Sequence, residues 1–291
     1  MHSLSRRTFL VAGASAAVVT ACGGGKKSAI SSTSTTPSPA DLVLATLSDT
    51  SALVPGSPQR MTFGFVDKEG VLLTTPPAPQ VDMNVSMGGQ TIATLKAAAH
   101  QSDLPRPYYP VVFTPPQAGV YDVTATVNGA AVQTQVQIPT STTVVGPGQP
   151  MIPLDTPTTA DPHGVQLVCT RSPACPLHDV TLRQALGAGT PVALLVSTPL
   201  YCKVAICGPV LEVLLKQKDQ FPQIKMLHAE VYPSDADAQP GHEKVTETVT
   251  AYGLTFEPVL YLAKADGTIA KRIDTIFDGV ELHDALAQLV S

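Results

Sequence analysis

The chain has no tryptophan and carries little charge. Asp, Glu, Lys and Arg make up 14% of its 291 residues, and the formal net charge is −5. The few basic residues are scattered along the sequence, so they do not form the positive patch that nucleic-acid binding needs. We therefore expect protein or small-molecule partners and no nucleic acid.

Long apolar runs are missing as well. The apolar stretch at residues 9–19 is too short to span a bilayer, and it lies between the charged pair Arg6 and Arg7 and a cysteine, Cys22, that follows small residues. This arrangement is typical of an export signal peptide rather than a transmembrane helix. We interpret residues 1–21 as that signal.

Two short motifs make the signal more specific. The run Ser5–Leu10 (SRRTFL) resembles the twin-arginine export motif, and Val19–Cys22 (VTAC) resembles the lipobox of bacterial lipoproteins. By this resemblance Cys22 is the lipidated first residue of the mature protein, which is then anchored to the extracytoplasmic face of a bacterial membrane. An ordinary secretory signal followed by a chance cysteine is the alternative.

Residues 22–40 are rich in Gly, Ser, Thr and Pro. Such a segment cannot bury enough apolar surface to offset the entropy of ordering, so we predict a flexible tether. About 250 residues follow, which suits two modest domains.

Residues 41–139 are predicted to form an all-β sandwich. Short β-branched or alternating runs are separated by Pro and Gly turns; these runs are 61–66, 81–86, 111–113, 121–127 and 132–138. Asn128-Gly129 is a hairpin signal between the last two.

The segment Phe113–Val123 resembles the turn and tyrosine corner of immunoglobulin-like domains, which implies that the Tyr121 hydroxyl bonds back to the preceding loop. That architecture serves many functions. Because this region has no cysteine and a single histidine, His100, we expect a spacer or docking module rather than a catalytic domain. A Pro/Thr/Gly-rich linker and hinge is expected at residues 140–163.

Residues 164–291 are predicted to form a mixed sheet covered by helices, because strand and helix patterns alternate before a closing hairpin. The expected strands are 192–196, 225–231, 259–263 and 269–273, and the expected helices are 209–220, 242–252 and 279–290.

From residue 190 onward this order resembles thioredoxin. The segment Tyr252–Leu262 (YGLTFEPVLYL) matches the part of that family that holds a cis-proline. The resemblance implies that Pro258 is this cis-proline, beside the redox cysteines, and that the backbone at Glu257 pairs with an extended substrate. Tyr201 corresponds to the aromatic residue before the first cysteine.

Cys202 and Cys207 are the predicted redox pair. They lie between an apolar strand and a helix, where unpaired backbone amides favour thiolate over thiol. Thioredoxins place two residues between the cysteines, whereas this chain places four. Counting from the strand makes Cys202 the attacking thiol, and counting from the helix makes it Cys207; we slightly favour Cys202. The family's buried acid has no counterpart in the strand 192–196.

Cys169 and Cys175 are predicted to form a structural disulfide, because exported cysteines a short loop apart usually pair. Metal binding is the competing chemistry: copper at Cys202 and Cys207 with His228, or zinc at Cys169 and Cys175 with His163 and His178, whose spacing fits no standard pattern. We expect no cofactor and no metal.

The predicted function is a membrane-tethered thiol-disulfide oxidoreductase that acts on exported proteins and is reset by a separate redox partner. A binding lipoprotein whose disulfides are all structural is the alternative, and copper delivery is a third.

Overall fold

A computed structural model describes residues 41–291, and all of these residues fall within one compact unit. The signal peptide, the tether and the lipidation at Cys22 lie outside the described residues and stay predictions. No helix within residues 41–291 has both the length and the apolar character needed to cross a bilayer.

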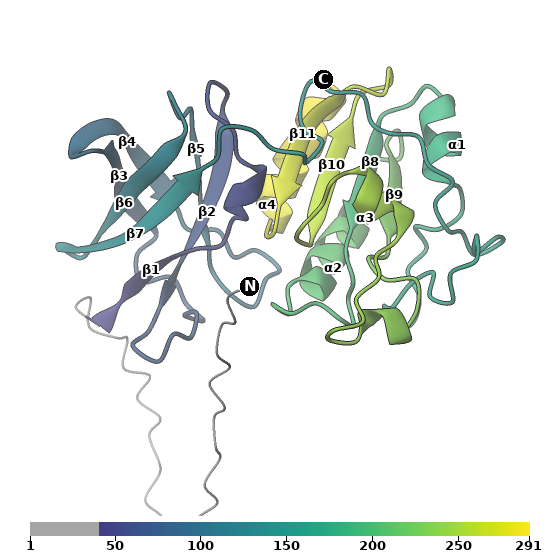
Figure 1. Ribbon diagram of the computed structural model, residues 1–291, viewed down its shortest axis with the longest axis horizontal. Helices are drawn as coiled ribbons and strands as arrows, with labels where there is room; N and C mark the ends of the chain where they lie inside the picture. Colours follow the sequence, from purple (N-terminus) through teal and green to yellow (C-terminus); the bar gives the residue numbers. More distant parts are fainter. Residues whose placement is uncertain (1–40) are drawn as a thin grey trace, which may run out of the picture. The chain divides into compact units, whose positions relative to one another are not determined.

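The N-terminal region is a sandwich of two antiparallel sheets (Figure 1). One sheet has the order β1-β2-β5 and the other the order β4-β3-β6-β7. Inward residues alternate with outward ones along β3 and β6, as expected where one face of a sheet is buried. The strands are β1 (Val43–Thr46), β2 (Gln59–Val66), β3 (Gln80–Met87), β4 (Gln90–Ala98), β5 (Tyr109–Phe113), β6 (Gly119–Val127) and β7 (Ala130–Ile138), with the short 3-10 helix η2 (Thr50–Ala52).

Two local predictions for the sandwich are confirmed. The buried Tyr121 donates its hydroxyl hydrogen to the carbonyl of Gln117 at 2.7 Å, which forms the expected corner. Asn128 and Gly129 both have positive φ, +48° and +83°, as a tight hairpin between β6 and β7 requires.

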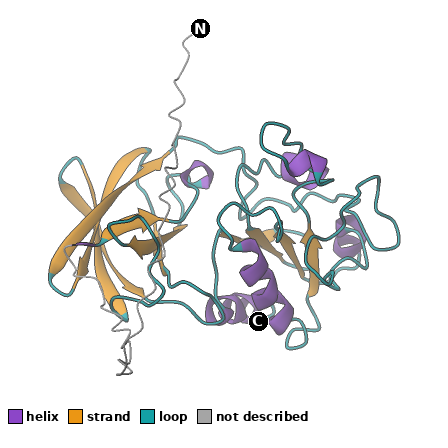
Figure 2. Cartoon of the chain, turned by 90° about the horizontal axis from the view of Figure 1, so that it is seen from below, coloured by secondary structure: helices purple, strands orange, loops and turns teal. Residues whose placement is uncertain are grey.

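The C-terminal region has a mixed four-stranded sheet with the order β11-β10-β8-β9. Strands β8 and β9 are parallel, and the other two pairs are antiparallel. All four α-helices of the described residues belong to this region (Figure 2). The elements are α1 (Leu182–Gly187), β8 (Val192–Val196), α2 (Cys207–Gln217), β9 (Lys225–Ala229), η3 (Ala236–Ala238), α3 (Glu247–Ala251), β10 (Val259–Ala263), β11 (Ile269–Asp274) and α4 (Gly279–Leu289).

Each face of this sheet has its own core. Ala193 and Leu195 of β8 pack with α2 and α4, whereas their neighbours Val192, Leu194 and Val196 pack with α1 and α3. The alternation follows from the two-residue period of a strand. Since every residue of β8 is buried, the sheet carries helices on both faces.

Residues 140–163 form part of the C-terminal region rather than the expected hinge. Val144, Met151 and Leu154 are buried in the core shared by α1 and α3. The Tyr252 hydroxyl donates to the carbonyl of Ile152, and Met151 N donates to the carbonyl of Gly267 at 2.8 Å. Proline-rich composition was therefore misleading here, because the segment is extended yet anchored by backbone hydrogen bonds.

The two regions meet through a buried ion pair. Arg60 of β2 contacts Glu281 of α4 with both ends of its guanidinium, at 2.5 and 2.7 Å, and also donates to the carbonyls of Asp274 and Ile276. Tyr108, from the segment before β5, donates its hydroxyl to the same carboxylate at 2.5 Å. Burial alone would raise the pKa of Glu281, but the charge of Arg60 lowers it overall.

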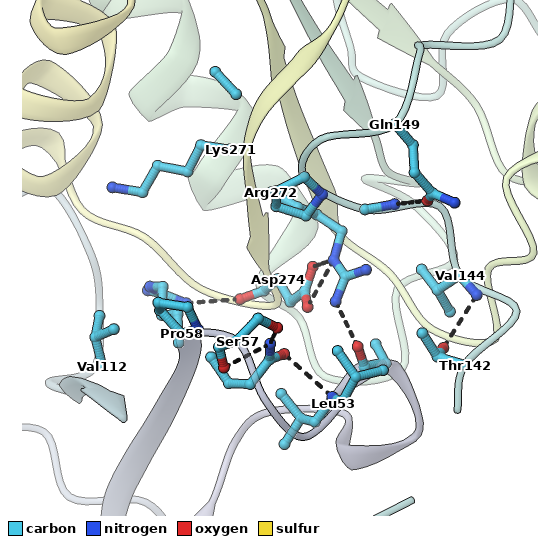
Figure 3. Close-up of a pocket in the computed structure, with 17 residues that line it drawn as sticks. Leu53, Ser57, Pro58, Val112, Thr142, Val144, Gln149, Lys271, Arg272 and Asp274 are labelled. Carbon is cyan, nitrogen blue, oxygen red and sulfur yellow. Dashed lines mark hydrogen bonds and ion pairs between the residues drawn. The ribbon is translucent and has the colours of Figure 1, made fainter. Parts of the chain in front are cut away.

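A cavity of about 580 Å³ lies next to this contact, between η2, the segment 142–149 and β11. Figure 3 shows Arg272 on its wall, where it pairs with Asp274 at 2.9 Å and donates to the carbonyl of Ala52 at 2.9 Å. These interactions tie β11 to the β-sandwich, so the cavity belongs to the contact between the two regions.

Candidate functional site

The loop between β8 and α2 brings Cys202 and Cys207 together. Cys207 is the first residue of α2 and is fully buried, whereas Cys202 is partly exposed. The backbone N–H of Cys207 points at the Cys202 sulfur, 3.3 Å away. Ala205 has a positive φ of +53°, so the four intervening residues fold into a tight turn rather than an open loop. Both thiols are free.

The environment separates these two thiols chemically. A hydrogen bond from the Cys207 thiol, together with the backbone amides of Cys207, Ile206 and Val204, lowers the pKa of Cys202 to about 6 although burial opposes it. Burial, followed by the interaction with Cys202, raises the pKa of Cys207. This asymmetry favours Cys202 as the attacking thiol.

Glu257 and Pro258 lie beside this pair. The Glu257–Pro258 peptide bond is cis, as predicted, and Pro258 is buried. Burial and then the negative charge at Cys202 raise the pKa of Glu257, and the Glu257 charge in turn raises the pKa of Cys207. Strand β8 is wholly apolar, so it offers no carboxyl group to these two thiols.

Tyr201, the residue before Cys202, is held by contacts with Asp235 and Tyr232. Its hydroxyl donates to the Asp235 carboxylate, and its ring packs edge-on against Tyr232 with centroids 6.1 Å apart. On either side of Cys202, Leu200 and Val204 are 65% and 69% exposed. Two exposed apolar side chains and the exposed, charged Lys203 therefore surround the thiol, with Tyr201 held in place beside it.

A second group of sulfur atoms, together with two imidazoles, lies where the segment 169–178 meets β9. Cys169, Cys175, His178 and His228 place their ligand atoms within 4.8 Å of one another. The predicted disulfide between Cys169 and Cys175 is not formed, because both thiols are free and face the two imidazoles. The one sequence feature that pointed to this cluster was the spacing of Cys175 and His178, which are three residues apart.

The positions of the histidines differ from both the copper and the zinc site that the sequence suggested. His228 of β9 joins Cys169 and Cys175, and not Cys202 and Cys207. His163 lies outside the cluster, with its backbone N–H bonded to the Asp161 carboxylate. A lone histidine in a core strand gave no reason to connect His228 with a loop more than fifty residues earlier.

No family model matches the chain, and no curated protein matches it. Among solved structures, an engineered protein is 20% identical over 35% of this chain, with a TM-score of 0.24, and the chain covers only 20% of it. The Lin-41 filamin domain is 16% identical, with 34% of this chain and 93% of the domain covered and a TM-score of 0.24. The ZirS C-terminal domain is 20% identical, with coverages of 47% and 97% and a TM-score of 0.22. These scores are too low to support a functional comparison.

Proposed function

We propose that the protein is a thiol-disulfide oxidoreductase with a thioredoxin-like C-terminal domain, tethered by a lipid on Cys22 to the extracytoplasmic face of a bacterial membrane. The observation that carries the proposal is the pairing of a partly exposed, low-pKa Cys202 with a buried Cys207 at the start of α2. A purely structural bridge has no need of such asymmetry. Exported proteins with thiols or disulfides are the proposed substrates.

The chemistry follows from the two environments. The Cys202 thiolate attacks one sulfur of a substrate disulfide, a new S–S bond forms, and the other substrate sulfur leaves as a thiolate. Cys207 then loses its proton and attacks the Cys202 sulfur, which releases the second substrate thiolate. The substrate gains two electrons, and Cys202 and Cys207 become a disulfide that a second redox partner must reduce.

The buried Cys207 needs a proton acceptor for the second step. Glu257 is the proposed acceptor: burial and then the negative charge at Cys202 raise its pKa towards the range in which a carboxylate can take a proton from a thiol. The apolar residues Leu200 and Val204 would contact extended, apolar stretches of the substrate.

The reduction potential of the Cys202–Cys207 pair tests the proposal. The full chain is equilibrated in graded glutathione buffers, alkylated and analysed by mass spectrometry, with Cys169 and Cys175 read in the same spectra as an internal comparison. A transition between about −120 and −270 mV would support exchange chemistry. A bridge intact below about −300 mV would refute it and leave a non-catalytic binding protein.

A trapping experiment adds a matched control. The Cys207→Ala variant should accumulate a mixed disulfide with a model substrate through Cys202, whereas Cys202→Ala should not. Equal trapping by both variants would contradict the assigned roles.

A further inference from the structure

Four ligand groups converge where the segment 169–178 crosses β9. Cys175, His178 and His228 are buried to 2% exposure each, and Cys169 is partly buried. Cys175 and His178 come from one loop, and His228 comes from the parallel strand β9. The donors therefore reach the same point from two separate elements.

Four of the six distances between the donor atoms have the lengths expected for the edges of a zinc tetrahedron, and all four donor atoms lie within 4.8 Å of one another. The His228 Nδ1 atom lies 3.8 Å from the Cys169 sulfur and 3.6 Å from the Cys175 sulfur, and the His178 Nε2 atom lies 3.3 Å from the Cys175 sulfur. The two nitrogens are 3.2 Å apart. Zinc bonds of about 2.3 Å to sulfur and about 2.0–2.1 Å to nitrogen give tetrahedral edges of about 3.5 Å for S···N and about 3.3 Å for N···N. The observed edges agree with these values.

The contacts of His228 favour the tautomer that a metal requires. Its Nε2 atom lies 3.1 Å from the Ser197 carbonyl oxygen, which can only accept, and 2.9 Å from the Ser197 hydroxyl, which can accept or donate, so a proton on Nε2 satisfies both contacts. Nδ1 then presents its lone pair to the two sulfurs and to His178. Histidine ligands of metal sites usually donate a hydrogen bond from their other ring nitrogen to a carbonyl or carboxylate oxygen or to a water molecule.

Charge also favours a divalent cation. Two thiolates and two neutral imidazoles sum to −2, which one dication neutralises, whereas an unneutralised buried charge is costly. Sulfur and imidazole donors in a tetrahedron suit zinc.

We propose that Cys169, Cys175, His178 and His228 bind a structural zinc ion, with release of the two thiol protons. Four protein ligands fill the tetrahedron, so no position is left for catalysis. The site fastens the segment 169–178 to β9. Thr170, next to Cys169, accepts a hydrogen bond from Leu200 N at 3.2 Å, so the zinc site also supports the loop that carries Cys202. The proposal stands whether or not Cys202 and Cys207 exchange disulfides.

Metal content of the full chain tests the proposal. The protein is purified under a non-thiol reductant, stripped with a chelator, dialysed against Zn²⁺ and analysed by elemental mass spectrometry. We expect one zinc per chain. Replacement by Co²⁺ should give thiolate-to-cobalt charge-transfer bands and the intense visible bands of tetrahedral cobalt, a readout that needs no variant.

Variants separate the two cysteine pairs. Cys175→Ser, His228→Gln and Cys169→Ser should each lose the zinc and the tetrahedral cobalt spectrum. Cys169 is only partly buried, so Cys169→Ser is the variant best able to fold. The matched control, Cys202→Ser with Cys207→Ser, should keep one zinc. Zinc lost from that control instead, a six-coordinate cobalt spectrum, or no zinc bound by the reduced native chain would each overturn the assignment.

Discussion

The pKa values of Cys202 and Cys207 are shifted in opposite directions, and this difference can be measured. We expect the alkylation rate of Cys202 to rise with pH around a midpoint of about 6, well below the ordinary thiol value of about 8.5. Cys207→Ala should move the midpoint upward, because the hydrogen bond from the Cys207 thiol is the largest cause of the shift. The measurement is iodoacetamide labelling across pH 4.5–9.5 with mass-spectrometric readout of Cys202. A native midpoint near 8.5 would contradict this account.

Glu257 provides the second prediction for a single residue. We expect Glu257→Gln to slow resolution of the Cys202 mixed disulfide at least about tenfold, because general-base catalysis typically contributes 10²–10⁴-fold. Stopped-flow release of a chromogenic thiol measures this step, with Glu257→Asp as the control that keeps the carboxylate. If repulsion of the Cys207 thiolate is the main effect of Glu257, the Gln variant will resolve faster, which would exclude the base role.

At the residue scale, local signals were predictable and distant ones were not. Cys202, Cys207 and Pro258 were predicted to form a site because strand, cysteine and proline follow a familiar order; the structure brings the two cysteines together and makes the Glu257–Pro258 bond cis. The partnership of His228 with Cys175 was missed because it depends on how one loop crosses β9, which no spacing reveals. Cys169 and Cys175 were interpreted as a disulfide for the same reason.

Among the elements, α4 depends on one buried residue, Asp278. Its carboxylate caps α4 by accepting from Glu281 N at 2.9 Å, and it also accepts from Ser102 N and contacts His100 Nδ1 at 3.1 Å. We expect Asp278→Ala to lower the free energy of unfolding by at least about 1–2 kcal/mol, the usual value of a lost cap. Urea denaturation measures this. Asp278→Asn keeps the cap but not the charge, so its free energy of unfolding should fall less than that of Asp278→Ala. Equal losses in both variants would show that the cap contributes nothing.

Element prediction succeeded where the apolar residues form a continuous buried run, as in β10, or recur with a helical period, as in α4. Strand β10 begins and ends at the predicted residues, and α4 differs by one residue. Strand β4 was missed because most of its residues are exposed and only Ala97 is fully buried. Helix α3 is half the predicted length, since residues 242–246 follow an irregular path before Glu247.

At the scale of the whole molecule, the Arg60–Glu281 pair joins the two regions. Both side chains are largely buried, at 10% and 13% exposure. We expect Arg60→Ala to cost about 3–5 kcal/mol, because it leaves the Glu281 carboxylate buried without its partner. Chemical denaturation measures this loss. The double variant Arg60→Ala with Glu281→Ala should cost less than the sum of the two single changes, and strict additivity would show that the pair is not coupled.

A second contact between the two regions, His100 with Asp278, predicts a pH dependence of stability. Its hydrogen bond to Asp278 raises the pKa of His100 against the opposing effect of burial, while that contact lowers the pKa of Asp278. A raised histidine pKa stabilises the fold fully below the unfolded value of about 6.5, and the gain is lost as pH rises through the folded pKa. We therefore expect the difference in melting temperature between the native chain and His100→Gln to be largest near pH 5.5–6 and to shrink at alkaline pH. A difference that grows with pH would reverse the sign and contradict the assignment.

The coarse organisation of the described chain, a β-sandwich followed by a mixed sheet with helices, was predictable because each region has its own period of apolar residues. The way the regions join was not. Nothing in the sequence near Tyr108 or in residues 140–163 indicates that these segments are packed against the C-terminal region.

Leu104 and Tyr108 belong to the N-terminal half of the chain, yet both are buried in the core that contains α2 and α4. A break in the chain between the two halves would therefore remove buried residues from the core of the C-terminal half. Recombination that moved the C-terminal half alone into another gene would leave behind part of its own interior. The two regions are expected to be inherited together, as one unit of selection, despite their different architectures.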